Sequence, residues 1–187
     1  NRFFNDVEDF QIMTLIYNNL QKEFSENVHF EYFSKNFQKV KYQTEENIKI
    51  QAALEIGKPI PDFSFFTVEK GVVSPSTFKN EKTILFFWSF LSKKSIDLMP
   101  QLKELAKQTK TRVLAISFNI NEEDALQFAQ KNLTFALNAN EDKMFESQAA
   151  KTYDVKATPA FILVDMEGKI RCRTSDFDIL KEETEKI

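Results

Sequence analysis

The sequence predicts an α/β domain with a mixed β-sheet, preceded by a helical extension, and three observations support this fold class. From Lys82 onward, short apolar runs alternate with amphipathic segments, as in α/β proteins. Residues 1–56 contain neither proline nor glycine, so no strong helix breaker interrupts them. Pro59 and Pro61 flank a single residue and favour extended backbone. We therefore expect a helical extension at 1–56 and an α/β domain at 57–187.

The extension is expected to form two or three amphipathic helices. Asp6 and Asp9 resemble an N-cap and its N3 partner. A turn-rich third piece spans residues 45–54. An apolar helical stripe usually faces the local core, which favours packing on its own domain over a partner-binding or dimerising arm. Apolar residues recur near helical spacing in two sets: Val7, Phe10, Leu15, Ile16, Leu20 and Phe24, then Phe30, Phe33, Phe37 and Val40.

The elements of the α/β domain follow from the apolar pattern. Short strands are expected at 63–68 and 71–73, with a turn or short helix near 76–79. The continuous apolar run from Thr83 to Phe90 predicts a strand buried on both faces. The remaining predictions are a helix at 92–109, a strand at 112–118, a helix capped by Asn121 through 131, a strand at 134–136, a helix at 141–153, paired strands at 160–164 and 169–173, and a helix at 177–185.

Composition narrows the function classes. The formal net charge is -3 and no dense basic run occurs, so we expect no nucleic-acid partner. No apolar run is long enough to span a membrane. Cys172 is the single cysteine, which excludes an intrachain disulfide and a cysteine zinc site. His29 is the single histidine and forms no metal-binding pattern with Glu26 and Glu31, so we expect no metal and no cofactor.

The most informative segment is residues 88–100, WSFLSKKSIDLMP. It follows the apolar strand and opens a helix whose first turn contains Ser92 and Ser95, with Pro100 further along. Serine is a good N-cap, so the simplest role of Ser92 is to cap this helix.

A second motif lies far along the chain, where residues 157–165 have the sequence ATPAFILVD and 167–170 have EGKI. The start of the domain, GKPIPDF at 57–63, is a third. In this order and spacing the motifs resemble the thioredoxin-like superfamily, and within it the TlpA-like and AhpC/TSA-like thiol-disulfide oxidoreductases. The resemblance covers residues 57 to about 175 and implies a thioredoxin-like fold with a cis proline at Pro159.

The same resemblance places cysteines at the positions of Ser92 and Ser95. A serine hydroxyl forms no disulfide, so dithiol exchange at this site is excluded. Leu91 and Leu98 also depart from the aromatic residue and the glutamate that relatives carry. These joint changes favour a naturally redox-inactive member that binds a protein or extended peptide. The alternative is an active oxidoreductase whose two cysteines were replaced.

The resemblance also implies where a peptide would bind. In this fold the residue before the cis proline offers backbone hydrogen bonds to an extended chain, a form of strand addition that needs no thiol. The predicted peptide-binding residues are Trp88, Leu91, Ser92, Ser95, Thr158 and Pro159.

Two other chemistries are alternatives to peptide binding. Ser92 or Ser95 as a hydrolase nucleophile needs an adjacent base, and His29 lies in the extension. Cys172 lies between Arg171 and Arg173, which would favour a reactive or intermolecular thiol if it were exposed. A structural cysteine is the stronger expectation.

The cellular location follows from the resemblance alone. Relatives with such extensions are typically periplasmic or cell-envelope proteins. The chain begins with Asn1 rather than Met, so we expect a processed or truncated form, with any signal peptide or lipid anchor upstream.

Overall fold

The computed structural model describes residues 7–78 and 80–187, so the predicted N-cap at Asp6 lies outside the described residues. The chain divides into two compact units, one ending at Ile50 and the other comprising Gln51–Ile187. Each unit is described by itself. The predicted boundary between residues 56 and 57 stays a prediction.

The first unit is a pair of helices, α1 (Val7–Phe24) and the greater part of α2 (Val28–Ala53). The turn-rich piece expected at 45–54 belongs largely to α2, because nothing before Ala53 breaks the helix. The Tyr17 and Phe37 rings stack with centroids 4.2 Å apart. The small core consists of Tyr17, Phe30 and Phe37, with Met13, Leu20 and Phe33 packed against it.

Three residues of the predicted α1 stripe are exposed instead of contributing to that core: Leu15, Ile16 and Phe24. Successive helical residues are about 100° apart, so a stripe through Met13, Tyr17 and Leu20 leaves Leu15 on the opposite side of the helix.

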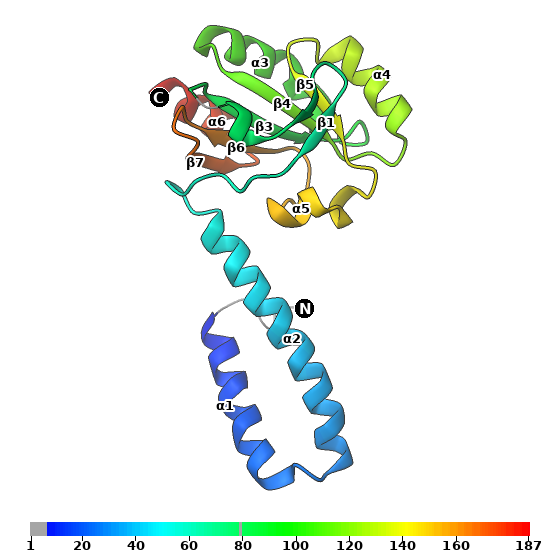
Figure 1. The fold of residues 1–187 in the computed structure, drawn as a ribbon, viewed down its shortest axis with the longest axis vertical. Coiled ribbons are helices and arrows are strands. Elements are labelled where there is room, and N and C mark those ends of the chain that lie inside the picture. Colours follow the sequence, from blue (N-terminus) through cyan, green and yellow to red (C-terminus); the bar gives the residue numbers. More distant parts are fainter. Residues whose placement is uncertain (1–6, 79) are drawn as a thin grey trace. The chain divides into compact units, whose positions relative to one another are not determined.

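The second unit contains a seven-stranded mixed sheet in the order β2-β1-β5-β4-β3-β6-β7 (Figure 1). The three central strands β3, β4 and β5 are parallel, and the other pairings are antiparallel. This architecture confirms the predicted α/β fold with a mixed sheet. The strands are β1 (Phe65–Thr67), β2 (Gly71–Val73), β3 (Thr83–Trp88), β4 (Arg112–Ser117), β5 (Leu137–Asn140), β6 (Ala160–Val164) and β7 (Ile170–Thr174).

Helices cover the sheet on both sides. Alternate residues of a strand point to opposite faces, and Ile84, Phe86 and Trp88 of β3 share one core with residues of α3, α4 and α6. On the other face, the Phe87 ring lies 5.7 Å from the ring of Tyr153, which caps α5. The helices are α3 (Lys93–Thr109), α4 (Glu122–Asn132), α5 (Gln148–Thr152) and α6 (Phe177–Lys186), with 3-10 turns at Pro75–Phe78 and Met144–Glu146.

The sequence prediction was wrong in one region. The strand expected at 134–136 is instead β5 at Leu137–Asn140, because the asparagines of β5 interrupt the apolar pattern that was used to predict strands. Asn138 is buried, and Glu69 offsets the cost by accepting hydrogen bonds from both its backbone and its side-chain nitrogen. The helix expected at 141–153 is divided into a 3-10 turn and α5, because the extended backbone of Ser147 separates them.

Candidate functional site

The site begins where β3 passes into α3. Ser92 has extended backbone (φ -97°, ψ 100°) and its Oγ accepts a hydrogen bond from the Ser95 backbone N–H at 3.3 Å. A hydroxyl at this position satisfies one of the unpaired N–H groups at the start of the helix. The predicted N-cap at Ser92 is therefore confirmed.

The fold brings the two distant sequence motifs into contact. The Ser92 hydroxyl donates to the Thr158 carbonyl oxygen at 3.0 Å, across 66 positions of sequence. The Thr158–Pro159 peptide bond is cis. Thr158 is half-buried and Pro159 is buried, so Thr158 is the accessible residue of the pair. A single hydrogen bond thus joins the start of α3 to the loop before β6.

The predicted site residues fall into two layers. Leu91 is 75% exposed, and Ser92 and Thr158 are half-buried. Trp88 and Ser95 are fully buried and Pro159 is buried, which corrects their expected place on a peptide-binding surface. Trp88 faces the core because it is on the same face of β3 as Phe86, and its ring packs 5.5 Å from Phe128.

The buried layer has unsatisfied polar atoms. Within the described residues, Trp88 Nε1 and Ser95 Oγ have no hydrogen-bond partner. Burying a polar group without a hydrogen-bond partner lowers the free energy of unfolding by about 1–3 kcal/mol. The interior position of Ser95 is therefore a poor environment for a hydroxyl.

Nucleophilic catalysis by Ser92 finds no support in this geometry. The described partners of its Oγ are the Thr158 carbonyl and the Ser95 N–H, and neither can remove a proton from the hydroxyl. Lys93, the nearest lysine in sequence, pairs instead with Asp97. In the described part of the chain, no group of three or more His, Cys, Asp or Glu is arranged to hold a metal ion.

A buried asparagine, missed from the sequence, fixes the loop that presents Leu91. Asn119 lies just after β4, and its Oδ1 accepts from Ser89 Oγ at 2.8 Å and from the Phe90 N–H at 3.3 Å. Ser89 Oγ in turn accepts from the Leu91 N–H at 3.2 Å. The sequence signal that could have identified Asn119 is its position as a polar residue at the carboxyl end of a buried strand, β4. This end of β4 lies beside the end of β3.

This network places a second exposed apolar residue beside the site. Ile120 follows Asn119 and is 77% exposed. The loop before α3 and the loop before α4 are joined through Asn119, so Leu91 and Ile120 belong to neighbouring loops. We call the surface formed by Thr158, Ser92, Leu91 and Ile120 the docking surface.

Cys172 is a structural cysteine. It lies on β7 opposite Leu163 and is 5% exposed. Burial, with a smaller contribution from the charge of Glu183, raises the pKa of its thiol above the ordinary value. A buried, protonated thiol is a poor nucleophile. The hypothesis that Cys172 is a reactive or intermolecular thiol is therefore not supported.

The fold and the paired loop motifs define a thioredoxin-like domain without a thiol pair. The family model of the AhpC/TSA family matches residues 56–173, and the chain belongs to this family. The predicted family is therefore confirmed. Among the residues that the structure describes, no helix has the length and apolar character needed to cross a membrane.

Two relatives are named as thiol-disulfide oxidoreductases. The proteins named thiol-disulfide oxidoreductase ResA from Bacillus thuringiensis subsp. konkukian and from Bacillus cereus are each 29% identical to the chain over 119 residues. The match covers 63% of this chain and 68% of theirs.

Solved structures show the same fold. A thiol-disulfide oxidoreductase from Bacteroides fragilis is 25% identical, with a TM-score of 0.60, covering 70% of this chain and 100% of that one. The thioredoxin domain of a Bacteroides vulgatus thiol-disulfide oxidoreductase is 23% identical, with a TM-score of 0.62, covering 71% and 97%. The exposed lipoprotein thioredoxin Etrx1 of Streptococcus pneumoniae is 20% identical, with a TM-score of 0.57, covering 68% and 100%.

Proposed function

We propose that this chain is a redox-inactive member of its family that binds an extended peptide, or an extended segment of a protein, on the docking surface. Thiol-disulfide exchange requires a thiolate that attacks and a second thiol that resolves the mixed disulfide. Serines stand at both positions, and the one cysteine of the chain is buried on β7. The observation that carries the proposal is that the exposed layer of the site has its hydrogen bond between Ser92 and Thr158 and its exposed apolar surface although it contains no thiol.

Three features of that layer suit an extended chain. Leu91 and Ile120 offer exposed apolar surface on neighbouring loops. Thr158 offers backbone groups next to them, and its carbonyl keeps a second lone pair beyond the bond from Ser92. Backbone hydrogen bonds with flanking apolar contacts are the usual means of binding an extended peptide by strand addition.

A peptide array tests the proposal directly. The chain is labelled and applied to an array of short extended peptides, beside two variants, Leu91→Glu and Met166→Glu. Both replace an exposed apolar side chain by a charge, but Met166 lies in the turn between β6 and β7, at the far end of β6 from Thr158. We expect binding by the parent chain and by Met166→Glu, and its loss in Leu91→Glu. Equal binding by all three, or none by the parent, contradicts the proposal.

A second candidate function has one observation in its favour. Ser95 Oγ is fully buried without a partner, whereas a thiol is a weak hydrogen-bonding group that is readily buried. The position thus fits cysteine better than serine. This favours an oxidoreductase whose cysteines were replaced at Ser92 and Ser95.

The source gene separates the two candidates, since cysteine codons at positions 92 and 95 support the second. A double variant, Ser92→Cys with Ser95→Cys, measures whether the scaffold still supports exchange. A thiol at the start of α3 is activated by the helix N-terminus, so we expect the variant to reduce a model disulfide and the parent chain to be inactive. An inactive variant that folds like the parent contradicts this candidate.

A location outside the cytoplasm is part of the proposal. One structure of the same fold is an exposed lipoprotein. Fractionation of the source cells, with the chain detected by antibody, is expected to find it in the envelope fraction. Recovery with cytoplasmic markers contradicts this.

A further inference from the structure

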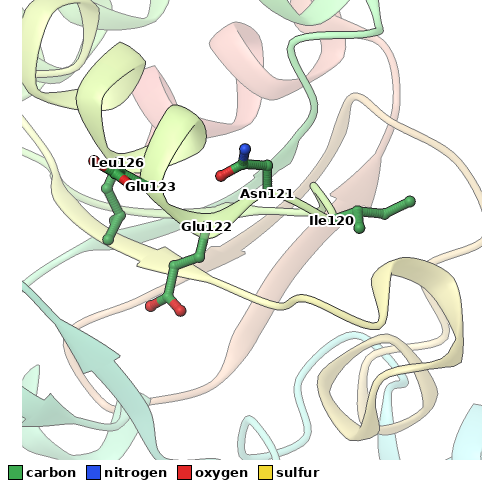
Figure 2. Close-up of a pocket in the computed structure, with 5 residues that line it drawn as sticks. All are labelled: Ile120, Asn121, Glu122, Glu123 and Leu126. Atoms are coloured by element: carbon green, nitrogen blue, oxygen red, sulfur yellow. The ribbon is translucent and has the colours of Figure 1, made fainter.

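The two ends of the docking surface are held in different ways. At one end, hydrogen bonds of Asn119 fix the loop that carries Leu91 and join it to the loop of Ile120. Figure 2 shows the Ile120 side chain extending along its own loop and away from α4. At the other end, the carbonyl oxygen of Thr158 accepts a hydrogen bond from Ser92. One such bond fixes a residue only if the segment that leads to it is held as well.

The residues just before Thr158 have few contacts of their own. Lys156 and Ala157 are exposed, and in the described part of the chain no backbone-to-backbone hydrogen bond involves residues 156–158. A hollow of about 310 Å³ lies beside them, lined by residues 153–157, by the start of β6 and by the end of β7. Exposed backbone and few packed neighbours are typical of segments that open readily. The position of Thr158 therefore depends on how the segment begins.

A cluster of polar side chains around Asp154 holds the beginning of the segment. Gln51 Nε2 donates to Asp154 Oδ2 at 2.5 Å, and the Arg173 guanidinium lies 3.9 Å from the same oxygen. Lys156 Nζ lies 3.0 Å from Asp154 Oδ1. Arg173 also donates to Gln51 Oε1 and to the Tyr153 carbonyl, each at 3.4 Å. Gln51 is the first residue of the second unit, so the whole cluster lies in that unit.

The chain changes direction at the residue that the cluster holds. Asp154 has a φ of 50°, in the left-handed region. Aspartate tolerates this backbone better than most residues because its short side chain forms hydrogen bonds nearby. The Asp154 side chain is 18% exposed and that of Arg173 is 25% exposed, so water and salt screen this pair less than a surface pair. Four positions separate the fixed turn at Asp154 from Thr158.

We propose that Asp154, held by Gln51 and Arg173, positions the segment that presents Thr158 to a bound peptide. Asp154 is a positioning residue, because it acts on the peptide only through Thr158. This inference rests on the proposed function and adds a second fixed point to the docking surface, beside the one at Asn119. The competing explanation is that the cluster contributes only to the stability of the domain.

Two substitutions of the same residue distinguish these explanations. Asp154→Gly removes the cluster yet fits left-handed backbone, whereas Asp154→Asn keeps an acceptor for Gln51 and tolerates this backbone. Affinity for an array peptide that the parent chain binds, labelled with fluorescein, is measured by fluorescence anisotropy. We expect Asp154→Gly to weaken binding about fivefold, Gln51→Ala to act in the same direction, and Asp154→Asn to resemble the parent. Parent-like affinity in Asp154→Gly, or an equal loss in Asp154→Asn, overturns the proposal.

A matched control separates positioning from a general loss of stability. Glu81→Ala breaks the pair of Glu81 with Arg112, another arginine that is only 24% exposed. Arg112 begins β4, whereas Asn119 follows the opposite end of that strand. We expect urea denaturation to show a loss of stability in Glu81→Ala and anisotropy to show unchanged peptide affinity. Peptide binding weakened as much as in Asp154→Gly overturns the proposal.

Amide NMR signals of the free chain test the positioning without any peptide. In Asp154→Gly, we expect the signals of Thr158 and Ser92 to shift or broaden, and in Asp154→Asn and Glu81→Ala to stay in place. Unchanged signals in Asp154→Gly overturn the proposal, while peptide binding by the parent chain leaves the proposed function standing. If the signals change as expected but no array peptide binds the parent chain, the proposed function fails and the positioning of Thr158 by Asp154 is supported.

Discussion

The exposed layer and the buried layer of this site differ in how completely the polar atoms of their side chains are hydrogen-bonded. In the exposed layer, the Ser92 hydroxyl both donates and accepts a hydrogen bond. In the buried layer, Ser95 Oγ and Trp88 Nε1 have no partner. Of the four buried side-chain polar atoms that lack partners in the described residues, three belong to Trp88, Ser95 and Asn119. The hydrogen bonds of the exposed layer are thus satisfied, while the interior accommodates serine at a cost in free energy. This difference is what we expect of a site that binds a peptide without thiols, as proposed above.

The largest expected effect comes from the residue that joins the two layers. Asn119→Ala removes the acceptor of Ser89 Oγ and of the Phe90 N–H, leaving buried donors unpaired. We expect the free energy of unfolding to fall by about 2–3 kcal/mol, measured by urea denaturation. Peptide affinity should also fall, because the loop carrying Leu91 is no longer fixed. A loss of stability below about 0.5 kcal/mol would show that the network does not hold this loop.

The contrast between the two serines predicts effects of opposite sign. Ser95→Ala removes a buried hydroxyl without a partner, so the free energy of unfolding should rise by about 1 kcal/mol. The same denaturation experiment measures it. Destabilisation would mean that the hydroxyl is satisfied in solution, and the buried layer would then fit serine as well as the exposed layer does.

Ser92→Ala removes the N-cap of α3 and the bond to Thr158. We expect the free energy of unfolding to fall by about 1 kcal/mol. Ser147, which caps α5, offers a matched control: Ser147→Ala should also destabilise the chain, but only Ser92→Ala should weaken peptide binding. Unchanged peptide affinity in Ser92→Ala would remove Ser92 from the docking surface.

The smallest effect concerns Cys172. Because burial raises the pKa of its thiol, the folded chain should react slowly with iodoacetamide at pH 8 and the urea-unfolded chain rapidly, as followed by mass spectrometry. The raised pKa also means that the unfolded chain loses this proton first as pH rises. Stability from the buried neutral thiol is therefore present at neutral pH and declines above the unfolded pKa, about 8.5. Rapid labelling of the folded chain would contradict a structural role.

Local sequence patterns predicted the elements that carry the site but not its layering. The apolar run at 83–90, the cap at Ser92 and the motif around Thr158 depend on neighbouring residues, and each was found from the sequence. The roles of Asn119 and Ile120 depend on the parallel pairing of β3 with β4, in which Trp88 lies opposite Ser117. That register is set by contacts between distant segments, which apolar periodicity does not report. The burial of Trp88 and Ser95 followed from the same tertiary packing.

The most direct test of binding without thiols is an amide chemical-shift map of the chain with a peptide selected from the array. The account predicts that the largest shifts fall on Leu91, Ser92, Ile120 and Thr158, with the protein fully reduced and no covalent adduct by mass spectrometry. Shifts centred on another face, or binding that requires a disulfide to Cys172, would contradict it.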